Sequence, residues 1–371
     1  MPAPPVCCSM APTDPWAQHG GVFWDEHTHV QDLHSCVRAD VLDAWFPPGP
    51  EVVAVLRTSA TEFANTTPPE DSTILKGAIS AARGLDSKSI LCHAGSSALI
   101  YSCFRELVQR SSRVLVLDPT YGEYEHVATK AGRPVTRIPL PYPYCAASLL
   151  KSIERELMSG DLFALVNPNS PTGTVLPSEA LKSLMNTFDR TTFWVDETYS
   201  EYVDQPNSLE RVASAHHNLI VCKSMSKVYA LSGLRVGYAV SLEERIAEFR
   251  GLIPPWAVCL PAQLAGEAAL RSTGYYRERY IETHQLRSLL CRAIEQQLGW
   301  PVQEGAINCV LTFPNQRPDE IVATLRKRGV YIRSGFHYGG REALRIAVRS
   351  APENARTVGA LSAAANVRTG R

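Results

Sequence analysis

Apolar and polar residues along the chain follow the order expected when strands and helices alternate. Short apolar runs predict buried strands at residues 89–95, 113–119, 162–168 and 191–196. Residues 72–85 and 96–109 have the spacing of amphipathic helices. Apolar strands separated by helices are typical of a mostly parallel sheet covered on both faces. The pattern therefore predicts an α/β protein.

The C-terminal part repeats this alternation on a smaller scale. We expect helices at residues 243–253, from about Tyr275, and at residues 318–329 and 352–367. We expect strands at residues 307–313, 330–335 and 343–349. The predicted division is an N-terminal arm at residues 1–45 that packs with the small domain, a large domain at 46–250, and an interdomain helix with a small α/β domain at 251–371.

Composition argues against several classes of protein. The 371 residues include 45% hydrophobic residues, enough to bury a large core, and the formal net charge is zero. We therefore expect neither nucleic acid nor an anionic membrane as a partner. The N-terminus has no signal-peptide pattern, no apolar run is long enough to span a bilayer, and the ten cysteines form no CxxC pair. We expect a soluble, cytoplasmic protein with reduced thiols.

The stretch from residue 221 to 240, VCKSMSKVYALSGLRVGYAV, concentrates the chemistry of the chain. Lys227 lies beside Ser224 and Ser226, and Arg235 follows eight residues later. An amine can attack an aldehyde, while hydroxyls and a guanidinium can hold a phosphate dianion. An amine beside a phosphate cradle describes a site for pyridoxal 5'-phosphate (PLP). The alternative is a surface lysine with a solvated arginine.

This stretch resembles the Schiff-base segment of the class I/II aminotransferases, which are PLP enzymes of fold type I. The similarity runs from about His19 to near the C-terminus, and it is greatest to enzymes like threonine-phosphate decarboxylase and histidinol-phosphate aminotransferase. It implies a large domain with a mostly parallel, seven-stranded type of sheet and a smaller C-terminal α/β domain. It also implies that Lys227 binds PLP as a Schiff base and that the protein is a homodimer.

Three further stretches supply the rest of the expected cofactor site. Gly95, Ser96 and Ser97 precede a predicted helix, whose N-terminus attracts an anion, although a simple helix cap is the alternative. Tyr121 follows a strand, and the resemblance implies that its ring covers the pyridine ring of PLP. Asp196 ends an apolar strand, where a buried carboxylate needs a cation such as the protonated pyridine nitrogen.

The segment NPNSPTG departs from its relatives, which usually read NPNNPTG. Ser170 stands where relatives have an asparagine that bonds the phenolic oxygen of PLP, and Asn169 precedes it. A serine reaches less far, so the tuning of that oxygen is altered here. Tyr199 matches the tyrosine that bonds the same oxygen in relatives. Thr67 replaces a tyrosine that in relatives reaches across a dimer interface to the partner's cofactor phosphate.

The substrate side is expected from the resemblance alone. Arg345 would bind the substrate carboxylate as a fork, and Arg333 occupies the position of a second arginine in relatives with phosphate-bearing substrates. His19 and Gly20 belong to an HGG segment like that of threonine-phosphate decarboxylases. The segment from Pro254 to Trp256 also resembles threonine-phosphate decarboxylases, and we expect it to lie near the substrate. The histidines at 27, 29 and 34 fit no known ligand spacing, so no metal is predicted.

These observations leave three hypotheses open. The resemblance favours an aminotransferase that acts on a small amino-acid substrate. The alternative within the family is decarboxylation of a phospho-amino acid, or β/γ-elimination or replacement in a natural-product pathway. The HGG segment, the segment from Pro254 to Trp256 and the departures at Ser170 and Thr67 support this alternative. A regulatory PLP-sensing protein is the third hypothesis, but such a protein is expected to carry an added DNA-binding domain or to lack the lysine.

Overall fold

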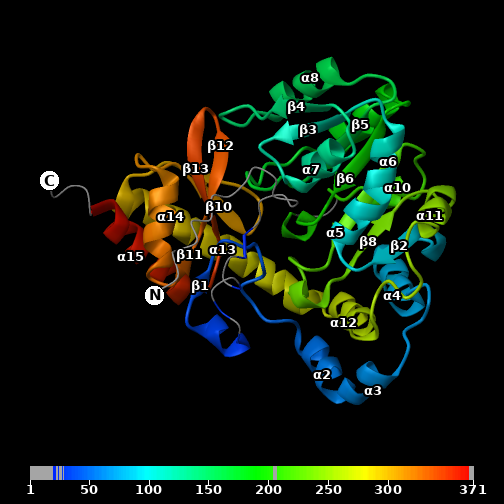
Figure 1. Ribbon diagram of the computed structural model, residues 1–371, viewed down its shortest axis with the longest axis horizontal. Coiled ribbons are helices and arrows are strands. Elements are labelled where there is room, and N and C mark those ends of the chain that lie inside the picture. The colour runs from blue at the N-terminus through cyan, green and yellow to red at the C-terminus, as the bar shows by residue number, and fades with distance from the viewer. Residues whose placement is uncertain (1–19, 22–23, 25–26, 28, 204–206, 367–371) are drawn as a thin grey trace, which may run out of the picture.

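A seven-stranded sheet forms the centre of the larger part of the protein (Figure 1). The computed structural model describes residues 20–21, 24, 27, 29–203 and 207–366. The strand order is β2-β8-β7-β6-β5-β3-β4. The strands are β2 (Ile90–His93), β3 (Val114–Asp118), β4 (Val135–Pro139), β5 (Leu162–Val166), β6 (Thr192–Asp196), β7 (Leu219–Ser224) and β8 (Gly237–Val240). Only β8 runs antiparallel to its neighbours in this sheet, so the predicted mostly parallel sheet is confirmed.

Both faces of this sheet are buried, each in a hydrophobic cluster of its own. Successive side chains of a strand point to opposite faces, so each strand contributes to both clusters. In β3, Val114 and Val116 enter one hydrophobic cluster, and Leu115 and Leu117 enter the other. One face is covered by α6 (Arg105–Arg110), α7 (Glu123–Lys130) and α11 (Glu243–Arg250). The other is covered by α4 (Thr73–Arg83), α8 (Ala146–Glu156), α9 (Ser178–Thr187) and α12 (Leu260–Arg271). The strands therefore read as apolar runs in the sequence.

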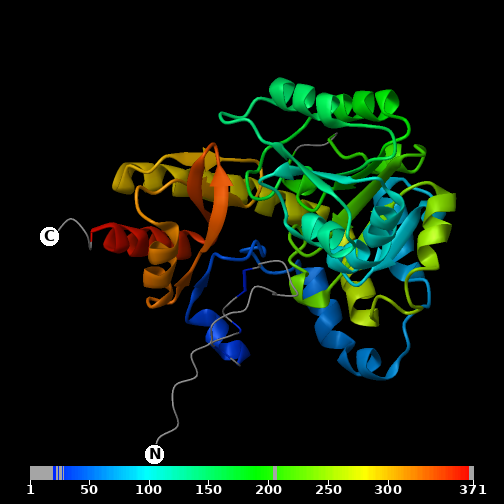
Figure 2. The same cartoon turned by 45° about the horizontal axis from the view of Figure 1, so that its top comes forward.

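A second, antiparallel sheet is formed by the C-terminal part of the chain. Its order is β12-β13-β10-β9, with β9 (Val302–Glu304), β10 (Cys309–Thr312), β12 (Arg333–Tyr338) and β13 (Arg341–Ala347). Its helices are α14 (Pro318–Arg326) and α15 (Ala351–Asn366). The long helix α13 (Thr273–Leu298) runs from the larger part to this sheet, as both views show (Figures 1 and 2).

The N-terminal segment joins the C-terminal part through a two-stranded parallel sheet. Here β1 (Val37–Arg38) pairs with β11 (Val330–Tyr331). After β1 the chain crosses to α2 (Pro50–Thr58) and α3 (Ala60–Asn65), which lie beside the larger part (Figure 1). The division of the chain at residues 45 and 250 stays a prediction.

Two predicted elements differ from the structure. The expected helix at residues 96–109 is α5 (Ser96–Leu99), a π-helical turn (Ile100–Phe104) and α6 in succession. The expected strand at residues 330–335 is divided at Ile332, because β11 pairs with β1 whereas β12 pairs with β13. The other strands and helices named above from the sequence occur at the expected places. Short helical turns are Val30–His34, Ser87–Ser89, Ser200–Tyr202, α10 (Glu210–Ala213) and Ser232–Leu234.

Candidate functional site

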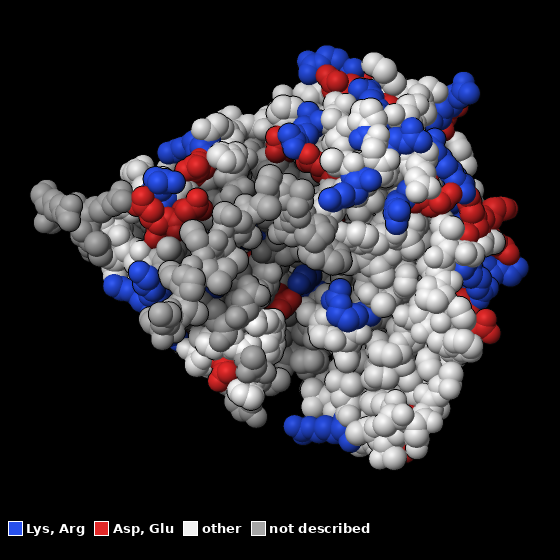
Figure 3. All heavy atoms as spheres, in the orientation of Figure 1, with Lys and Arg blue, Asp and Glu red and all other residues white. Residues whose placement is uncertain are grey.

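A cavity of about 240 Å³ lies between the two sheets, at the carboxyl ends of β5, β6 and β7. In the space-filling view it is a hollow with basic and acidic atoms inside it (Figure 3). The ends of parallel strands are a common place for ligand sites in α/β proteins. The predicted site residues that line it are Gly20, Ser96, Ser97, Tyr121, Ser170, Asp196, Tyr199, Ser224, Ser226, Lys227, Arg235, Arg333 and Arg345.

Three predicted residues are not among those that line the cavity. Gly95 lies directly before the lining serines. Asn169 is buried, and its side chain is bonded to Thr120, Thr172 and the carbonyl of Pro119. The side-chain amide of Asn169 therefore holds together the loops that follow β3 and β5. It is not placed to contact a ligand in the cavity. His19 lies outside the described residues.

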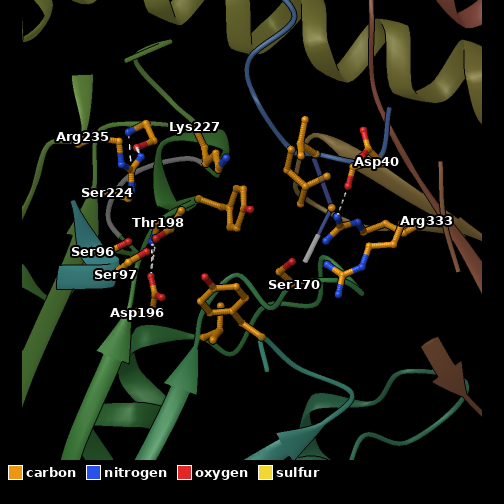
Figure 4. A pocket seen from close by; sticks show the side chains of 18 residues that line it. Asp40, Ser96, Ser97, Ser170, Asp196, Thr198, Ser224, Lys227, Arg235 and Arg333 are labelled. Atoms are coloured by element: carbon orange, nitrogen blue, oxygen red, sulfur yellow. Dashed lines mark hydrogen bonds between the residues drawn. The ribbon is translucent and has the colours of Figure 1, made fainter. Parts of the chain in front are cut away.

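One end of the cavity is a cradle for an anion. Ser96, Ser97, Ser224 and Arg235 converge there in the close view (Figure 4). Arg235 Nη1 lies 3.4 Å from the Ser226 hydroxyl, which places the guanidinium beside the serines. Arg235 has a φ of +54°, a left-handed conformation that costs a non-glycine residue free energy and is more frequent at functional sites.

Two glycines allow the chain segments of this cradle to approach one another. A Cβ on Gly95, whose φ is +85°, would lie 2.8 Å from Arg235 Nη2. A Cβ on Gly237 in β8 would lie 2.8 Å from the backbone nitrogen of Ser96 and 2.7 Å from the carbonyl oxygen of Lys223. Side chains at these positions would push the helix N-terminus away from the strands.

The amine of Lys227 lies at the edge of the cavity, just beyond β7 (Figure 4). Lys227 Nζ donates a hydrogen bond of 2.7 Å to Asp43 Oδ1, and the two side chains are each 26% exposed. The amine is therefore held at a defined place and is open to a ligand. Asp43 was not predicted from the sequence as the partner of this amine.

Asp196 lies at the end of β6 and is buried. Its carboxylate accepts bonds from the Thr198 amide at 2.9 Å, the Thr198 hydroxyl at 2.6 Å and the Tyr124 hydroxyl at 2.7 Å. Burial raises the pKa of Asp196 above its usual value, because the charged form is poorly solvated there, although these bonds oppose the shift. A cationic group of a ligand would remove this cost, as the sequence predicts for a protonated ring nitrogen.

Aromatic and hydroxyl groups line the middle of the cavity. Tyr121 and Tyr199 both contribute, and burial raises the pKa of each phenol, so both keep their proton at neutral pH. Ser170 is buried and lines the cavity as well. The cavity wall therefore offers a flat ring and hydroxyl donors to a bound aromatic group.

Arg333 lies at the opposite end of the cavity (Figure 4), and Arg345 also lines the cavity. The guanidinium carbons of Arg333 and Arg345 lie 5.0 and 5.3 Å from the ring centre of Phe336. Burial and the charge of Arg345 lower the pKa of Arg333 to about 10. Two like charges this close favour a bound anion. A second cavity of about 530 Å³ continues outward from here and shares Tyr121, Ser170, Arg333 and Arg345 with the first.

Residues 39–43, which we call the strap, close the cavity on the side of the small sheet. The carbonyls of Ala39 and Asp40 accept hydrogen bonds from the Ala347 amide and the Arg345 side chain. The carbonyls of residues 41 and 43 accept from Arg349, and that of residue 42 accepts from Asn308. Every carbonyl of the strap is thus bonded to the C-terminal part of the chain.

A buried ionic cluster lies next to the cavity without lining it. Lys223 is 2% exposed and lies within 4 Å of Glu197, Glu201 and Glu210, while Arg83 pairs with the latter two. Burial raises the pKa of Glu197 to about 7, although Lys223 opposes the shift. The cluster joins the segment after Asp196 to the strand before Lys227, and so fixes the two functional residues relative to each other.

The residues present fit a bound PLP. The serines and Arg235 form a phosphate cradle that side chains at Gly95 or Gly237 would obstruct. A lysine amine, a buried carboxylate and a tyrosine ring lie in the same cavity. These are the groups that an aldehyde, a pyridine nitrogen and an aromatic ring require.

Six residues of the site were missed by the sequence analysis. Asp40, Val41, Leu42, Val166 and Thr198 also line the cavity, and Asp43 contacts Lys227. Only Thr198 has a local signal, since it lies two residues beyond the predicted Asp196. The segment from Pro254 to Trp256, expected near the substrate, does not line the cavity. Trp256 is 50% exposed, and its amide bonds to the Glu70 carbonyl, so this segment packs on the turn before α4.

Among the described residues there is neither a metal-ligand cluster nor a membrane-spanning helix. In the part of the chain that the structure describes, no group of three or more His, Cys, Asp or Glu side chains is arranged to hold a metal ion. No helix within the described ranges has the length and apolar character needed to span a membrane. The described cysteines are all free.

Comparison with known proteins identifies relatives over most of the chain. The family model "Aminotransferase class I and II" matches residues 39–361. Histidinol-phosphate aminotransferase 2 from Gluconobacter oxydans is 29% identical over 329 residues, which cover 84% of this chain and 89% of that protein.

Two solved structures show the likeness of fold. Histidinol-phosphate aminotransferase from Sinorhizobium meliloti, solved in complex with pyridoxal 5'-phosphate, is 20% identical with a TM-score of 0.80, and the match covers 92% of this chain and 95% of that chain. L-threonine-O-3-phosphate decarboxylase from Porphyromonas gingivalis is 22% identical with a TM-score of 0.74, and that match covers 86% of this chain and 96% of the other. The expected fold type I architecture is confirmed.

Proposed function

The chain belongs to the class I and II aminotransferase family and is a PLP-dependent enzyme, and from this premise we propose that it transfers the amino group of a small, phosphate-bearing amine or amino acid. The observation that carries the proposal is one cavity that holds a lysine amine, an anion cradle, a buried carboxylate and two arginines. We propose that the predicted residues that line this cavity act in the roles predicted for them from the sequence.

The cradle and the buried carboxylate bind and orient the cofactor in this proposal. Ser96, Ser97, Ser224 and Arg235 hold its phosphate, and Asp196 keeps a proton on its ring nitrogen. When bound, PLP supplies an aldehyde that condenses with an amine and a ring that delocalises an electron pair from the substrate Cα. Tyr121 covers the ring, and Tyr199 and Ser170 offer hydroxyl hydrogen bonds to its phenolic oxygen.

Lys227 has two tasks in the reaction. With the cofactor bound, its amine would hold the aldehyde carbon, and once released the same amine would take a proton from the substrate Cα and return one at another carbon. Lys227 lines the same cavity as the cradle serines and the two arginines, and Figure 4 shows its side chain beside the cavity. A single flexible side chain can therefore serve both steps.

The two arginines favour a substrate with strong negative charge. Arg345 and Arg333 lie together at the end of the cavity opposite the cradle. A phosphate, or a carboxylate together with a phosphate, would neutralise both guanidinium groups. The Gluconobacter relative is named for histidinol phosphate, a substrate that also carries a phosphate. We therefore propose phosphate-bearing substrates as the first class to test.

Decarboxylation of a phospho-amino acid is the second candidate. Gly20 and Ser170 support it, and both line the cavity. Gly20 belongs to the HGG segment that resembles threonine-phosphate decarboxylases, and Ser170 replaces the asparagine that is usual in relatives. A serine in place of the usual asparagine changes the bonding of the phenolic oxygen and leaves room beside it. The choice between the reactions depends on which substrate bond stands perpendicular to the ring.

Product analysis distinguishes the two reactions. Purified protein with PLP is mixed with L-histidinol phosphate or with O-phospho-L-threonine, without any keto acid, and the spectrum and products are recorded. An aminotransferase converts the cofactor stoichiometrically to its pyridoxamine form and yields a carbonyl product. A decarboxylase leaves the cofactor spectrum in its aldehyde-derived form and releases CO2 from phosphothreonine alone, because histidinol phosphate has no carboxyl group.

A lysine variant tests the cofactor site itself. Lys227→Ala is expected to give no PLP adduct that borohydride fixes to the protein, because the condensing amine is gone. Lys182→Ala is the matched control, since Lys182 is an exposed lysine paired with Glu179 on α9. Mass spectrometry after reduction measures both variants. A fixed adduct in Lys227→Ala would overturn the assignment of the lysine.

The assembly and location of the enzyme are further proposals. We propose a homodimer because the family resemblance implies one, and the segment around Thr67 is exposed in the single chain, where a partner would reach it. Light scattering of the active protein tests this, and a fully active monomer would refute it. The free cysteines support a reducing, cytoplasmic location.

A further inference from the structure

The amine of Lys227 has a partner that the proposed reaction does not use. Asp43 Oδ1 accepts hydrogen bonds from Lys227 Nζ at 2.7 Å and from the Ser232 hydroxyl at 2.8 Å. Burial opposes ionisation of Asp43, but Lys227, Ser232 and the nearby charge of Arg349 hold its pKa at about 2. Asp43 therefore carries a negative charge throughout the neutral pH range.

The position of Asp43 is set by a different part of the protein from that of Lys227. Asp43 is the last residue of the strap, whose carbonyls are all bonded to the C-terminal part of the chain. Lys227 follows β7 of the large sheet. Asp43 is not among the residues that line the cavity, so it reaches the amine from outside the cofactor space. The strap therefore holds the Asp43 carboxylate in one position, where it can bind the amine of Lys227 whenever that amine is free.

The ion pair has a different strength in the two states of the lysine. A free ammonium has three N–H donors. Condensation with an aldehyde forms a carbon–nitrogen double bond and releases the aldehyde oxygen as water, and two of the three protons on the ammonium leave with that oxygen. One N–H at most remains for Asp43. The carboxylate therefore stabilises the released lysine more than the condensed lysine.

We propose that Asp43 is a positioning residue that stabilises Lys227 each time its amine is released from the cofactor, and so makes the lysine easier for an incoming amine to displace. This inference rests on the proposed function, in which displacement of Lys227 begins each turnover. It assigns Asp43 a role in the balance between lysine-bound and substrate-bound cofactor. It predicts that loss of the carboxylate strengthens PLP binding.

Two equilibrium titrations of Asp43→Asn test the inference, and neither measures turnover. Cofactor-free protein is titrated with PLP by visible absorbance, and the loaded protein is then titrated with methoxyamine, an uncharged amine that displaces the lysine. The pair is partly exposed, so we expect PLP to bind about two- to tenfold more tightly in the variant. We expect half-release of Lys227 to need more methoxyamine by a similar factor.

Two matched variants control the measurement. Asp43→Glu keeps the negative charge, and we expect its PLP and methoxyamine titrations to lie between those of wild type and Asp43→Asn. Glu51→Gln removes a carboxylate on α2 that accepts a hydrogen bond from Ser272 and does not line the cavity, and we expect it to titrate like wild type. A purely structural role of Asp43 would instead weaken PLP binding when the residue is changed.

The outcomes separate this inference from the proposed function. If wild type takes up no PLP, the proposed function fails. If wild type takes up PLP but Asp43→Asn binds it equally or less tightly with a native circular dichroism spectrum, only the inference is overturned. If Asp43→Asn does not fold, wild type is titrated with methoxyamine at rising ionic strength. Screening of the ion pair is expected to raise the half-release concentration, and a constant value would overturn the inference.

Discussion

Replacement of Asp196 by asparagine tests the electrostatic centre of the site. The carboxylate is 3% exposed and accepts three hydrogen bonds, so asparagine fits the same space with little movement. The change removes the negative charge that faces the expected ring nitrogen. Loss of one partner from a buried ion pair costs about 3–5 kcal/mol. We therefore expect kcat/KM to fall by about 10²- to 10⁴-fold.

The stability of the cofactor-free protein should change in the opposite sense. Burial raises the pKa of Asp196, which means that the folded protein without a cationic partner disfavours the charged carboxylate. Asparagine removes this cost, so the Tm without PLP is expected to stay equal or rise, while the increase in Tm on adding PLP becomes smaller. Thermal unfolding with and without PLP, and initial rates with an identified substrate, give both numbers.

Asp196→Glu is the control for charge at this position. It keeps the carboxylate but lengthens the side chain, so we expect an activity between those of wild type and Asp196→Asn. The reasoning would be refuted by an Asp196→Asn variant that retains kcat/KM within about tenfold of wild type, or that loses Tm without PLP while its response to PLP stays unchanged.

Three further predictions follow from the site and its surroundings. Burial raises the pKa of Glu197 from 4.5 to about 7, so the folded state keeps a proton that the unfolded state releases, and the free energy of unfolding should fall by up to about 3 kcal/mol between pH 4.5 and 7. Glu197→Gln should flatten this slope in urea titrations, and an unchanged slope would contradict the assignment. Gly237→Ala should cost about 1–3 kcal/mol and weaken PLP binding at least about tenfold, because the new Cβ meets backbone atoms of Ser96 and Lys223. Gly233→Ala, which meets nothing within 4 Å, serves as its control in thermal unfolding. Arg333→Gln should raise KM for a phosphate-bearing substrate by about 10- to 100-fold with a smaller change in kcat, since a charged hydrogen bond is worth about 1.5–3 kcal/mol, and an unchanged KM in steady-state kinetics would remove Arg333 from the substrate site.

The sequence predicted the parts of the fold in which local pattern and final environment agree. The strands of the large sheet are buried on both faces, so their residues are apolar throughout and the runs are easily recognised. The split at Ile332 could not be predicted, because both halves of that segment have strand character and only their partners differ. The π-helical turn after Leu99 has no pattern that distinguishes it from an α-helix.

The candidate site was predictable where its residues lie in compact motifs. Lys227, Ser224, Ser226 and Arg235 occur within twelve residues, and they line one cavity in the structure. Asp43 has no such motif. It lies 184 positions before Lys227, and the two meet only because the strap is anchored by residues still farther along the chain. Long-range pairing of this kind leaves no periodic or local signal in a single sequence.

The anchoring of the strap also bears on how the protein is made. Four residues donate the hydrogen bonds that hold the strap. They are Asn308, Arg345, Ala347 and Arg349. The large sheet is complete at Val240, long before those residues emerge from the ribosome. A nascent chain therefore contains every residue of the cofactor cradle before it contains the residues that anchor the wall opposite the cradle.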